Sequence, residues 1–226
     1  MIYSIEGNIG SGKSTLIKYL NEYLDPELFV FIQEPIEDWK QIVDPETKQN
    51  KIEQFYGDMK THAFSFQMMA YISRLVKIKE ALKKYPNKHI IVERSLYTDK
   101  NVFAKMLYED KLIGETDYQI YNQWFSHFIE ELPPIHYVYL QTNPEIALKR
   151  IRKRNRSGEE SITIEYIQRC HQKHKEWLLM EPSKHLIING NRERNTKEDY
   201  THIMDMIKKF MITPMDLHKM TMNGIV

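Results

Sequence analysis

Glycines and a lysine near the amino terminus have the spacing of a phosphate-binding loop. The pattern G-x-x-x-x-G-K-S/T, between a short apolar run and a helical segment, is met by Gly7-Asn8-Ile9-Gly10-Ser11-Gly12-Lys13-Ser14. Backbone N–H groups of such a loop point at phosphate oxygens, and the next helix adds its positive end. Lys13 would reach the β- and γ-phosphates, and Ser14 would ligate Mg²⁺. The loop predicts a nucleoside triphosphate site, which kinases, GTPases and ATPases share. The guanine-reading motif N-K-x-D is absent from the sequence.

Two carboxylates and an arginine follow the next predicted strands. Glu34 comes directly before Pro35, and Glu93-Arg94-Ser95 follows a later strand. Phosphoryl transfer to an alcohol needs a proton acceptor, a held magnesium ion and cations for the charge on the transferring group. Glu34 suits the base, Glu93 the magnesium shell and Arg94 the phosphate clamp. Either motif alone is as well explained by a loop salt bridge, but their occurrence beside the phosphate loop favours catalysis.

A dense run of positive charge occurs farther along the chain. Six of the eight residues from 149 to 156 are lysine or arginine, and Ser157-Gly158-Glu159-Glu160 follows. Such a run is usually a solvated helix face, but in an α/β phosphotransferase this is the place of an arginine-bearing lid that closes over the triphosphate. We expect a lid at about residues 150–162. Arg150 and Arg154 share one helical face, as do Arg152 and Arg156, so we expect one pair to point inward.

The elements that must position these residues follow from hydrophobic patterning. Short, nearly continuous apolar runs predict buried parallel strands at residues 2–5, 29–32, 89–92, 136–140 and 186–188. Helical periodicity begins near Lys13, Ile52, Asp99, Asp117, Pro144, Thr163 and Lys197. This alternation predicts one α/β domain over residues 1–226, with a five-stranded parallel sheet flanked by helices and a tail, 211–226, of unassigned role. Ligands of such sheets bind at the carboxyl ends of the strands.

One helix carries polar residues on an otherwise apolar face. Gln67, Ala70, Tyr71 and Arg74 lie at i, i+3, i+4 and i+7, so they share that face. If buried, the glutamine and the arginine need polar partners. A nucleobase would supply one partner, and Asp99 would supply the other. The alternative is an amphipathic helix whose polar face points outward.

Composition limits the partners and the compartment. The formal net charge is +1, from 32 basic and 31 acidic residues, which argues against a nucleic-acid polymer as partner. Cys170 is the only cysteine, so no internal disulfide forms, and we expect it half-buried on a helix. No apolar run approaches the ~20 residues of a membrane span, and because the phosphate loop begins at Gly7, we expect no leader peptide before it. We expect a cytoplasmic protein with no membrane partner, in which His171 and His174 lie on a solvated face.

The order and spacing of these motifs resemble the deoxynucleoside kinase family. That family includes deoxycytidine, deoxyguanosine and mitochondrial thymidine kinases and the insect multisubstrate enzyme. The resemblance runs from about Met1 to Trp177 and rests on the loop through Thr15, Glu34-Pro35 with Trp39, Phe66-Gln67, Glu93-Arg94-Ser95 and the arginine-rich lid. It implies a P-loop kinase fold, ATP and Mg²⁺, transfer to the 5′-hydroxyl of a deoxynucleoside for salvage of DNA precursors, a homodimer, and feedback inhibition by a deoxynucleoside triphosphate.

The resemblance also implies a role for individual residues. Glu34 would take the 5′-hydroxyl proton, Arg94 would hold that hydroxyl and the phosphates, and Glu93 would support magnesium. The sugar 3′-hydroxyl would bind Tyr56 and Glu159. Gln67 would read the base edge, between walls formed by Trp39, Phe66, Phe103 and Ile52. The triphosphate would contact the loop including Thr15 and the lid residues Arg150, Arg154 and Arg156, with the adenine beside Asn189-Gly190-Asn191. Thr163 stands where the family's lid has a proline, and spacing favours Glu159 over Glu160 as the sugar contact.

The most specific expectation concerns which deoxynucleoside is the substrate. Arg74 and Asp99 match the charged pair of deoxycytidine- and purine-accepting members, whereas thymidine-accepting members carry smaller or uncharged residues. We therefore expect deoxycytidine, deoxyadenosine or deoxyguanosine over thymidine, and Ala70 favours deoxycytidine slightly. One alternative is a thymidylate or other nucleoside monophosphate kinase, which Glu34 near an anionic acceptor opposes. The other is a non-catalytic nucleotide-binding subunit, which the joint presence of Lys13, Glu34, Glu93 and Arg94 opposes.

Overall fold

A parallel sheet forms the centre of the molecule. The computed structural model describes residues 1–156, 159–180 and 185–212. The strand order is β2-β3-β1-β4-β5, and every neighbouring pair is parallel. The strands are β1 (Ile2–Glu6), β2 (Phe29–Ile32), β3 (His89–Glu93), β4 (Ile135–Gln141) and β5 (His185–Asn189). The predicted P-loop kinase fold with five parallel strands is confirmed.

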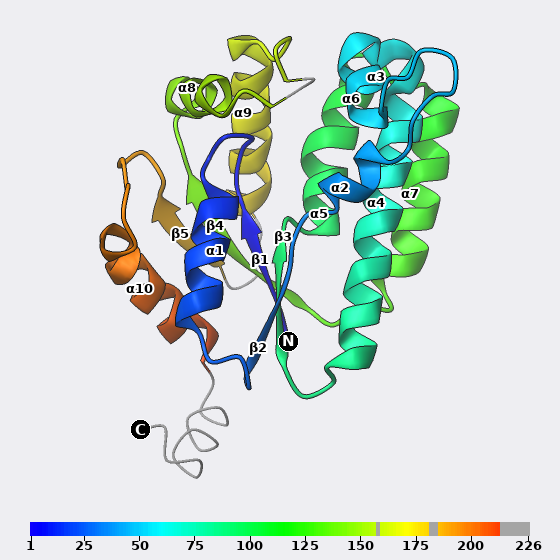
Figure 1. Cartoon of the computed structure of the whole chain (residues 1–226). Helices are drawn as coiled ribbons and strands as arrows, with labels where there is room; N and C mark the ends of the chain where they lie inside the picture. The colour runs from blue at the N-terminus through cyan, green and yellow to red at the C-terminus, as the bar shows by residue number, and fades with distance from the viewer. Residues whose placement is uncertain (157–158, 181–184, 213–226) are drawn as a thin grey trace.

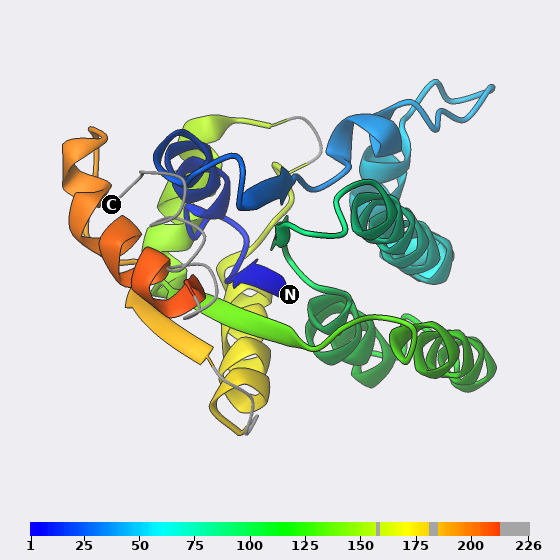
Figure 2. The ribbon, with the colours of Figure 1, turned by 90° about the horizontal axis from the view of Figure 1, so that it is seen from below.

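Helices cover both faces of the sheet (Figures 1 and 2). On one face Tyr3, Ile5 and Val138 pack against α1 (Lys13–Tyr23) and α10 (Thr201–Met211), which η2 (Glu198–Tyr200) precedes. On the other face Ile2, Ile90 and Tyr137 pack against α4 (Met59–Lys84), α7 (Glu115–Ile129) and α9 (Ile164–Met180). Because successive strand residues face opposite layers and both layers are covered, the strands read as continuous apolar runs.

Shorter helices surround the carboxyl edge of the sheet. They are α2 (Ile36–Lys40), α3 (Lys51–Gly57), α5 (Leu96–Thr98), the π-helical η1 (Asp99–Ala104), α6 (Lys105–Glu109) and α8 (Pro144–Arg154). Figure 1 shows α8 and the upper part of α9 on one side of this edge, and α2, α3 and α4 on the other. The carboxyl ends of β1, β2 and β3 point toward the space between these two groups of helices.

Several helix boundaries differ from the prediction. The helical segment expected from Ile52 is divided into α3 and α4, because Asp58 breaks it and its carboxylate accepts a hydrogen bond from Thr61 N (3.2 Å). The helix expected from Asp99 is preceded by α5, and α7 begins at Glu115 rather than near Asp117. In contrast, α8 begins at Pro144 as predicted.

The expectation that α9 has a solvated histidine face was wrong for His174. His174 and Cys170 are both fully buried. His174 Nδ1 lies 2.7 Å from the Cys170 carbonyl oxygen, and its ring lies parallel to Tyr139 at 6.1 Å. Burial, helped by the nearby charge of Arg94, lowers the pKa of His174 from 6.5 to about 3. His174 is therefore a neutral core residue, and Cys170 is more deeply buried than expected.

The end of α10 is held to the first strand. The Tyr3 hydroxyl of the central strand β1 donates to the Met211 carbonyl (2.8 Å), and Met211 is buried. Residues 213–226 of the predicted tail, and Ser157 and Gly158 of the predicted lid, lie outside the described residues. No helix in the described part of the chain is long and apolar enough to cross a membrane.

Candidate active site

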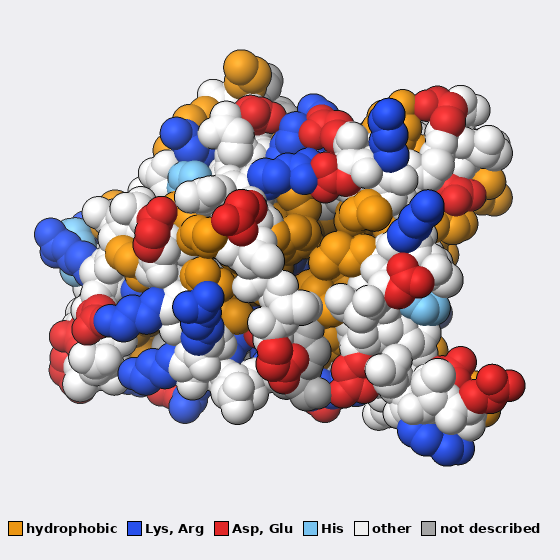
Figure 3. Space-filling model, turned by 90° about the horizontal axis from the view of Figure 1, so that it is seen from above, with side chains coloured by type: hydrophobic (Ala, Val, Ile, Leu, Met, Phe, Trp, Pro, Cys, Tyr) orange, Lys and Arg blue, Asp and Glu red, His pale blue; other side chains and the backbone are white. Residues whose placement is uncertain are grey.

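A pocket of about 370 Å³ opens at the carboxyl edge of the sheet. Seen from above, hydrophobic side chains form a hollow with acidic and basic side chains gathered along its rim (Figure 3). Most of the residues predicted for the site line this pocket, and they are Ile9, Gly10, Gly12, Lys13, Ser14, Thr15, Glu34, Trp39, Ile52, Tyr56, Phe66, Gln67, Arg74, Glu93, Arg94, Asp99, Phe103, Arg150, Arg154, Arg156 and Glu159. The parallel sheet thus brings together motifs that are far apart in the sequence.

The phosphate loop is packed against α8 and α9. Gly10 has φ +73°, and a Cβ there would lie 2.3 Å from the Ala147 carbonyl oxygen of α8, so this position requires glycine. The Asn8 side chain donates to the Ile167 carbonyl of α9 (2.8 Å) and accepts from Ile9 N (2.8 Å). These contacts tie the loop to both α8 and α9. Gly7, Asn8 and Ser11 belong to the loop but are not among the pocket-lining residues.

Lys13 is buried behind the loop. Its Nζ donates to the carbonyl oxygens of Gly7 (3.0 Å) and Asn8 (2.8 Å). Burial, and then the positive charge of Arg94, lowers the pKa of Lys13 from 10.5 to about 7. Its protonation state at neutral pH is therefore sensitive to any anion that enters the pocket.

Ser14 and Glu93 form a pair of oxygen donors. Ser14 is the second residue of α1, next to Lys13, and its Oγ donates to Glu93 Oε1 (2.8 Å) at the end of β3. A hydroxyl and a carboxylate at this spacing offer the hard oxygen ligands that Mg²⁺ prefers. The two residues named for magnesium from the sequence are thus side by side, and their chemistry fits that ion.

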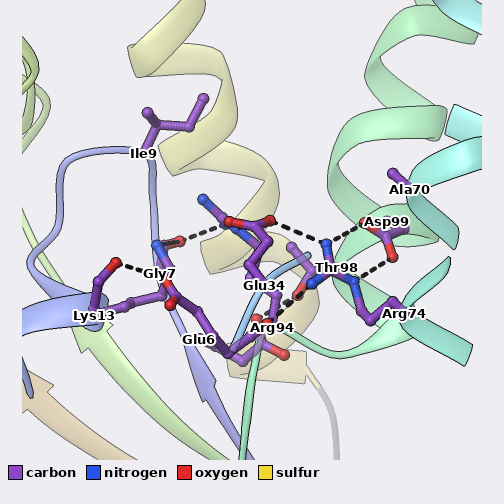
Figure 4. A network of polar contacts seen from close by, with 12 residues as sticks. Glu6, Gly7, Ile9, Lys13, Glu34, Ala70, Arg74, Arg94, Thr98 and Asp99 are labelled. Carbon is purple, nitrogen blue, oxygen red and sulfur yellow. Dashed lines mark hydrogen bonds and ion pairs between the residues drawn. The ribbon is translucent and has the colours of Figure 1, made fainter. Parts of the chain in front are cut away.

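A buried network of arginines and carboxylates lies beside this pair (Figure 4). Arg74 Nε donates to Asp99 Oδ2 (2.9 Å), Nη2 donates to Glu34 Oε1 (3.1 Å), and Nη1 donates to the Glu93 carbonyl (3.0 Å). The side chains of Arg74 and Asp99 are 4% and 2% exposed, so water screens this pair little. The predicted pairing of Arg74 with Asp99 is confirmed, and Glu34 is a further partner.

Arg94 lies between the phosphate loop and Glu34. Its φ of +64° is left-handed, which is costly for a residue with a Cβ. Its Nη1 donates to the Gly7 carbonyl (2.8 Å), its Nε lies 3.5 Å from Glu34 Oε1, and its guanidinium sits 5.1 Å from the Phe103 ring centre. The side chain therefore connects the candidate base to the phosphate loop.

The charge around Glu34 keeps it ionised. Burial acts to raise its pKa, but the guanidinium groups of Arg94 and Arg74 and the ammonium of Lys13 outweigh burial and lower the pKa from 4.5 to about 2. Glu34 is therefore a carboxylate throughout the neutral pH range, able to accept a hydrogen bond from a hydroxyl.

The far end of the pocket is a narrow aromatic slot. Trp39, Ile52 and Ala70 pack together, and Phe66 lies edge-on to Trp39 at 5.8 Å. Gln67 is 3% exposed, and its Oε1 accepts no hydrogen bond from the described residues. A buried amide oxygen of this kind calls for a polar partner, and a flat ring with a donor on its edge would provide it.

The expectation that one pair of arginines points inward holds for Arg150 and Arg154 but needs a correction for Arg152 and Arg156. Arg150 and Arg154 line the pocket and Arg152 is exposed, but Arg156 lines it as well. The reason is that α8 ends at Arg154 and the next residue, Asn155, turns the chain with a φ of +47°, so Arg156 no longer follows helical spacing. Arg154 donates to Glu159 through Nε (2.8 Å) and Nη2 (2.6 Å), and Arg156 Nη1 lies 3.5 Å from the same carboxylate. Burial, and then the charge of Glu159, raises the pKa of Tyr56.

The loop after β5 lies beside the phosphate loop rather than in the pocket wall. Arg150 Nη1 donates to the carbonyls of Ser11 (3.1 Å) and Gly190 (3.0 Å). The Asn191 side chain accepts from Asn143 N (2.7 Å), and Asn189 is exposed. Arg150 thus joins the base of the lid helix to the segment 189–191 that was assigned to adenine.

Sequence reasoning missed several residues of the site. Ile36, Phe55 and Tyr166 line the pocket, and the Phe55 ring stacks on Phe66 at 4.3 Å. Their apolar character made them look like ordinary core residues. Glu6 is fully buried behind the loop, and its position at the end of a buried strand was a signal that could have found it.

The fold and this site define a P-loop kinase, and comparisons with known proteins identify its family. The profile of the deoxynucleoside kinase family matches residues 3–212. A probable deoxycytidine kinase of fowlpox virus (strain NVSL) is 36% identical over 198 residues, which cover 83% of this chain and 78% of that protein. Deoxycytidine kinase 2 of Gallus gallus is 33% identical over 92% of this chain and 89% of that protein, and deoxycytidine kinase of Homo sapiens is 30% identical over 93% and 90%. The chain belongs to the deoxynucleoside kinase family and is an ATP-dependent kinase.

The lowered pKa of Lys13 predicts that ATP binding takes up a proton. Triphosphate oxygens favour the ammonium form, so the bound state has a higher pKa than about 7. At pH 8 ATP binding should therefore take up between about half and one proton, and ATP affinity should fall by up to about tenfold per pH unit above that pKa. Titration calorimetry in buffers of different ionisation enthalpy measures this uptake.

Lys13→Arg is the matched control, because arginine stays charged and should take up no proton at this position. Equal proton uptake by the parent and by Lys13→Arg would contradict the assignment of this proton to Lys13.

Proposed function

We propose that this kinase transfers the γ-phosphate of ATP to the 5′-hydroxyl of a deoxynucleoside and so supplies DNA precursors by salvage. The observation that carries the proposal is the position of an ionised carboxylate, Glu34, between two arginines and close to the Lys13 loop. An alcohol that bonds to Glu34 would then face phosphates held by the loop and Arg94. The human and chicken relatives, named as deoxycytidine kinases, support a nucleoside as acceptor.

Each charged residue of the site has a distinct task in this proposal. Glu34 orients the 5′-hydroxyl and accepts its proton as the new P–O bond forms, while the bond between the γ-phosphorus and the β,γ-bridging oxygen of ATP breaks and ADP leaves. Lys13 and the loop N–H groups hold the β- and γ-phosphates, and Arg94 neutralises charge that develops on the transferring group.

Magnesium would be held by Ser14 and Glu93. When bound, it would offset the negative charge of the β- and γ-phosphates. The pairing of Ser14 Oγ with Glu93 Oε1 at 2.8 Å supports this assignment. The lid arginines Arg150, Arg154 and Arg156 would add charge on the opposite side of the triphosphate and exclude water.

The nucleoside would lie in the aromatic slot. Its base would stack between Phe103 and the Trp39 and Phe66 walls, with Ile52 as an aliphatic contact, and its edge would bond to Gln67. The 3′-hydroxyl would bond to Tyr56 and Glu159. The orphan Oε1 of Gln67 supports the base contact, and the proximity of Tyr56 to Glu159 supports the sugar contact.

Glu34→Gln should lower kcat by about 10²-fold or more, with a smaller loss of nucleoside affinity, because general-base contributions are of this size. The measurement is steady-state phosphorylation of deoxycytidine with ATP and Mg²⁺. The same assay with deoxycytidine monophosphate as the acceptor tests the alternative class of acceptor. Glu37→Gln is the control: the same chemical change on a side chain that is 79% exposed should leave kcat unchanged.

Unchanged turnover in Glu34→Gln would overturn the role of this residue. A parent enzyme that phosphorylates the monophosphate rather than the nucleoside would overturn the proposed acceptor.

We also propose that the Arg74–Asp99 pair disfavours thymidine. The pair closes the pocket beside Ala70, and its guanidinium lies 5.9 Å from the Trp39 ring centre. The 5-methyl group of thymine would press on this buried pair, and leaving one partner unpaired costs about 3–5 kcal/mol. Deoxycytidine and purine deoxynucleosides carry exocyclic groups that can bond to the pair instead.

The double change Arg74→Met with Asp99→Ala should raise the ratio of kcat/KM for thymidine over deoxycytidine by at least about tenfold, since each kcal/mol of relieved strain changes the ratio severalfold. Both partners are replaced so that no charge stays buried alone. The matched control is Lys77→Met with Asp38→Ala, which removes a more exposed pair between α4, the helix of Arg74, and α2 (2.8 Å) and should leave the ratio unchanged. An unaltered ratio in the double variant, or a parent that already prefers thymidine, would contradict the proposal.

The family resemblance implies a homodimer, and an apolar surface supports this proposal. Ile72 and Val76 on α4 are 43% and 46% exposed, and Ile120 and Trp124 on α7 are 39% and 45% exposed. The two helices are in contact, because the Tyr71 hydroxyl donates to the Trp124 carbonyl (3.2 Å). Exposed apolar side chains gathered on adjacent helices are typical of subunit interfaces.

Trp124→Glu should convert the dimer into a monomer, because it places a charge in the centre of this apolar surface. Analytical ultracentrifugation measures the change. Ile42→Glu is the control, since Ile42 is 51% exposed on a separate loop and should leave the dimer intact. A parent protein that is monomeric, or a Trp124→Glu variant that stays dimeric, would contradict this interface.

A further inference from the structure

Glu6 is a buried carboxylate that the proposed reaction does not use. It ends β1 directly before the phosphate loop, and it is fully buried. Its Oε1 accepts from Ser4 Oγ (2.7 Å) and from Ser95 N (2.9 Å), and its Oε2 accepts from Thr98 Oγ1. A buried carboxylate requires such donors. Two of the three come from the segment that directly follows Arg94.

The two peptide groups on either side of the Arg94 Cα are both held by β1. The Arg94 N–H donates to the Ile5 carbonyl (3.2 Å), and the next N–H, that of Ser95, donates to the Glu6 side chain. Fixing both peptide planes fixes φ and ψ of the residue between them. Arg94 has φ +64°, a left-handed conformation that is unfavourable for a residue with a Cβ. Glu6 therefore supplies one of the two bonds that maintain this conformation.

The left-handed turn determines where the Arg94 side chain points. From this backbone the guanidinium reaches the Gly7 carbonyl and Glu34, beside the loop (Figure 4). Thr98, the third donor to Glu6, immediately precedes Asp99, which holds Arg74. One carboxylate thus anchors the segment that carries both Arg94 and Asp99.

We propose that Glu6 is a positioning residue that aims Arg94 at the transferring phosphate by holding the Ser95 N–H and the Thr98 hydroxyl. This inference rests on the proposed role of Arg94. A side chain misplaced by about 1 Å can cost up to 10²-fold in rate, so a loosened Arg94 should lower kcat while nucleoside affinity changes little. A carboxylate that served only to stabilise β1 and β3 would affect kcat through the amount of folded enzyme alone.

The test is a double-mutant cycle between Glu6→Gln and Arg94→Ala, measured as kcat per folded enzyme and as nucleoside dissociation constant. Glutamine has the size of glutamate but bonds more weakly to N–H donors. Glu6→Gln should lower kcat about tenfold in the parent, with a change in nucleoside affinity below about twofold, and should leave kcat of Arg94→Ala unchanged within about twofold. The same loss of kcat in both backgrounds, or no loss in the parent, overturns the proposal.

A second pair of variants keeps the inference testable if Glu6→Gln does not fold. Thr98→Val removes the hydroxyl donor and keeps the side-chain shape, whereas Thr98→Ser keeps the hydroxyl. We expect Thr98→Val to lower kcat and Thr98→Ser to restore most of it, and equal kcat in the two variants overturns the proposal. An Arg94→Ala enzyme with unchanged kcat would instead overturn the proposed function of Arg94, so the two failures are distinguishable.

Discussion

The guanidinium of Arg74 joins three segments that would otherwise be independent. It donates to Asp99 of η1, to Glu34 after β2 and to the Glu93 carbonyl at the end of β3. The negative charges of Asp99 and Glu34 outweigh the effect of burial and raise the pKa of Arg74, so it stays charged. Removing the charged partner of a buried cation lowers the free energy of unfolding by about 3–5 kcal/mol. The bonds to Arg74 therefore hold each of these segments at a fixed distance from α4. The position of Glu34 relative to Arg94 depends on this arrangement.

The parallel sheet provides the second constraint, because it brings the phosphate loop and the charged residues that follow its strands to one edge. Ile5 pairs with Glu93, so the phosphate loop leaves β1 at the same level at which Arg94 leaves β3. Just beyond this level the backbone takes positive φ angles, both at the glycines of the loop and at Arg94. Regular strands thus place the residues within reach, and the irregular positions that follow determine the direction of each side chain.

The sequence predicted the parts of the molecule that follow from local patterns. Continuous apolar runs identified the strands, and the glycine spacing identified the loop. The i, i+7 relation of Gln67 and Arg74 predicted a buried polar face and the pairing of Arg74 with Asp99. The prediction failed where a single backbone event decides the outcome. Asn155 in a left-handed conformation brings Arg156 into the pocket, and tertiary burial of α9 overrides the hydrophilic neighbours of His174. Such events depend on contacts between distant segments, which helical periodicity does not encode.

The cations assigned to the triphosphate already have acceptors within the protein. Lys13 and Arg94 share the Gly7 carbonyl, and Arg154 is paired with Glu159 at 2.6 Å. A triphosphate must therefore exchange contacts with these acceptors, and its net binding energy is smaller than the number of charged contacts suggests. In the proposed binding mode, this exchange would also link the two substrates. Drawing Arg154 toward phosphate would release the Glu159 carboxylate to accept a hydrogen bond from a sugar hydroxyl, so each substrate would favour the arrangement of side chains that the other requires.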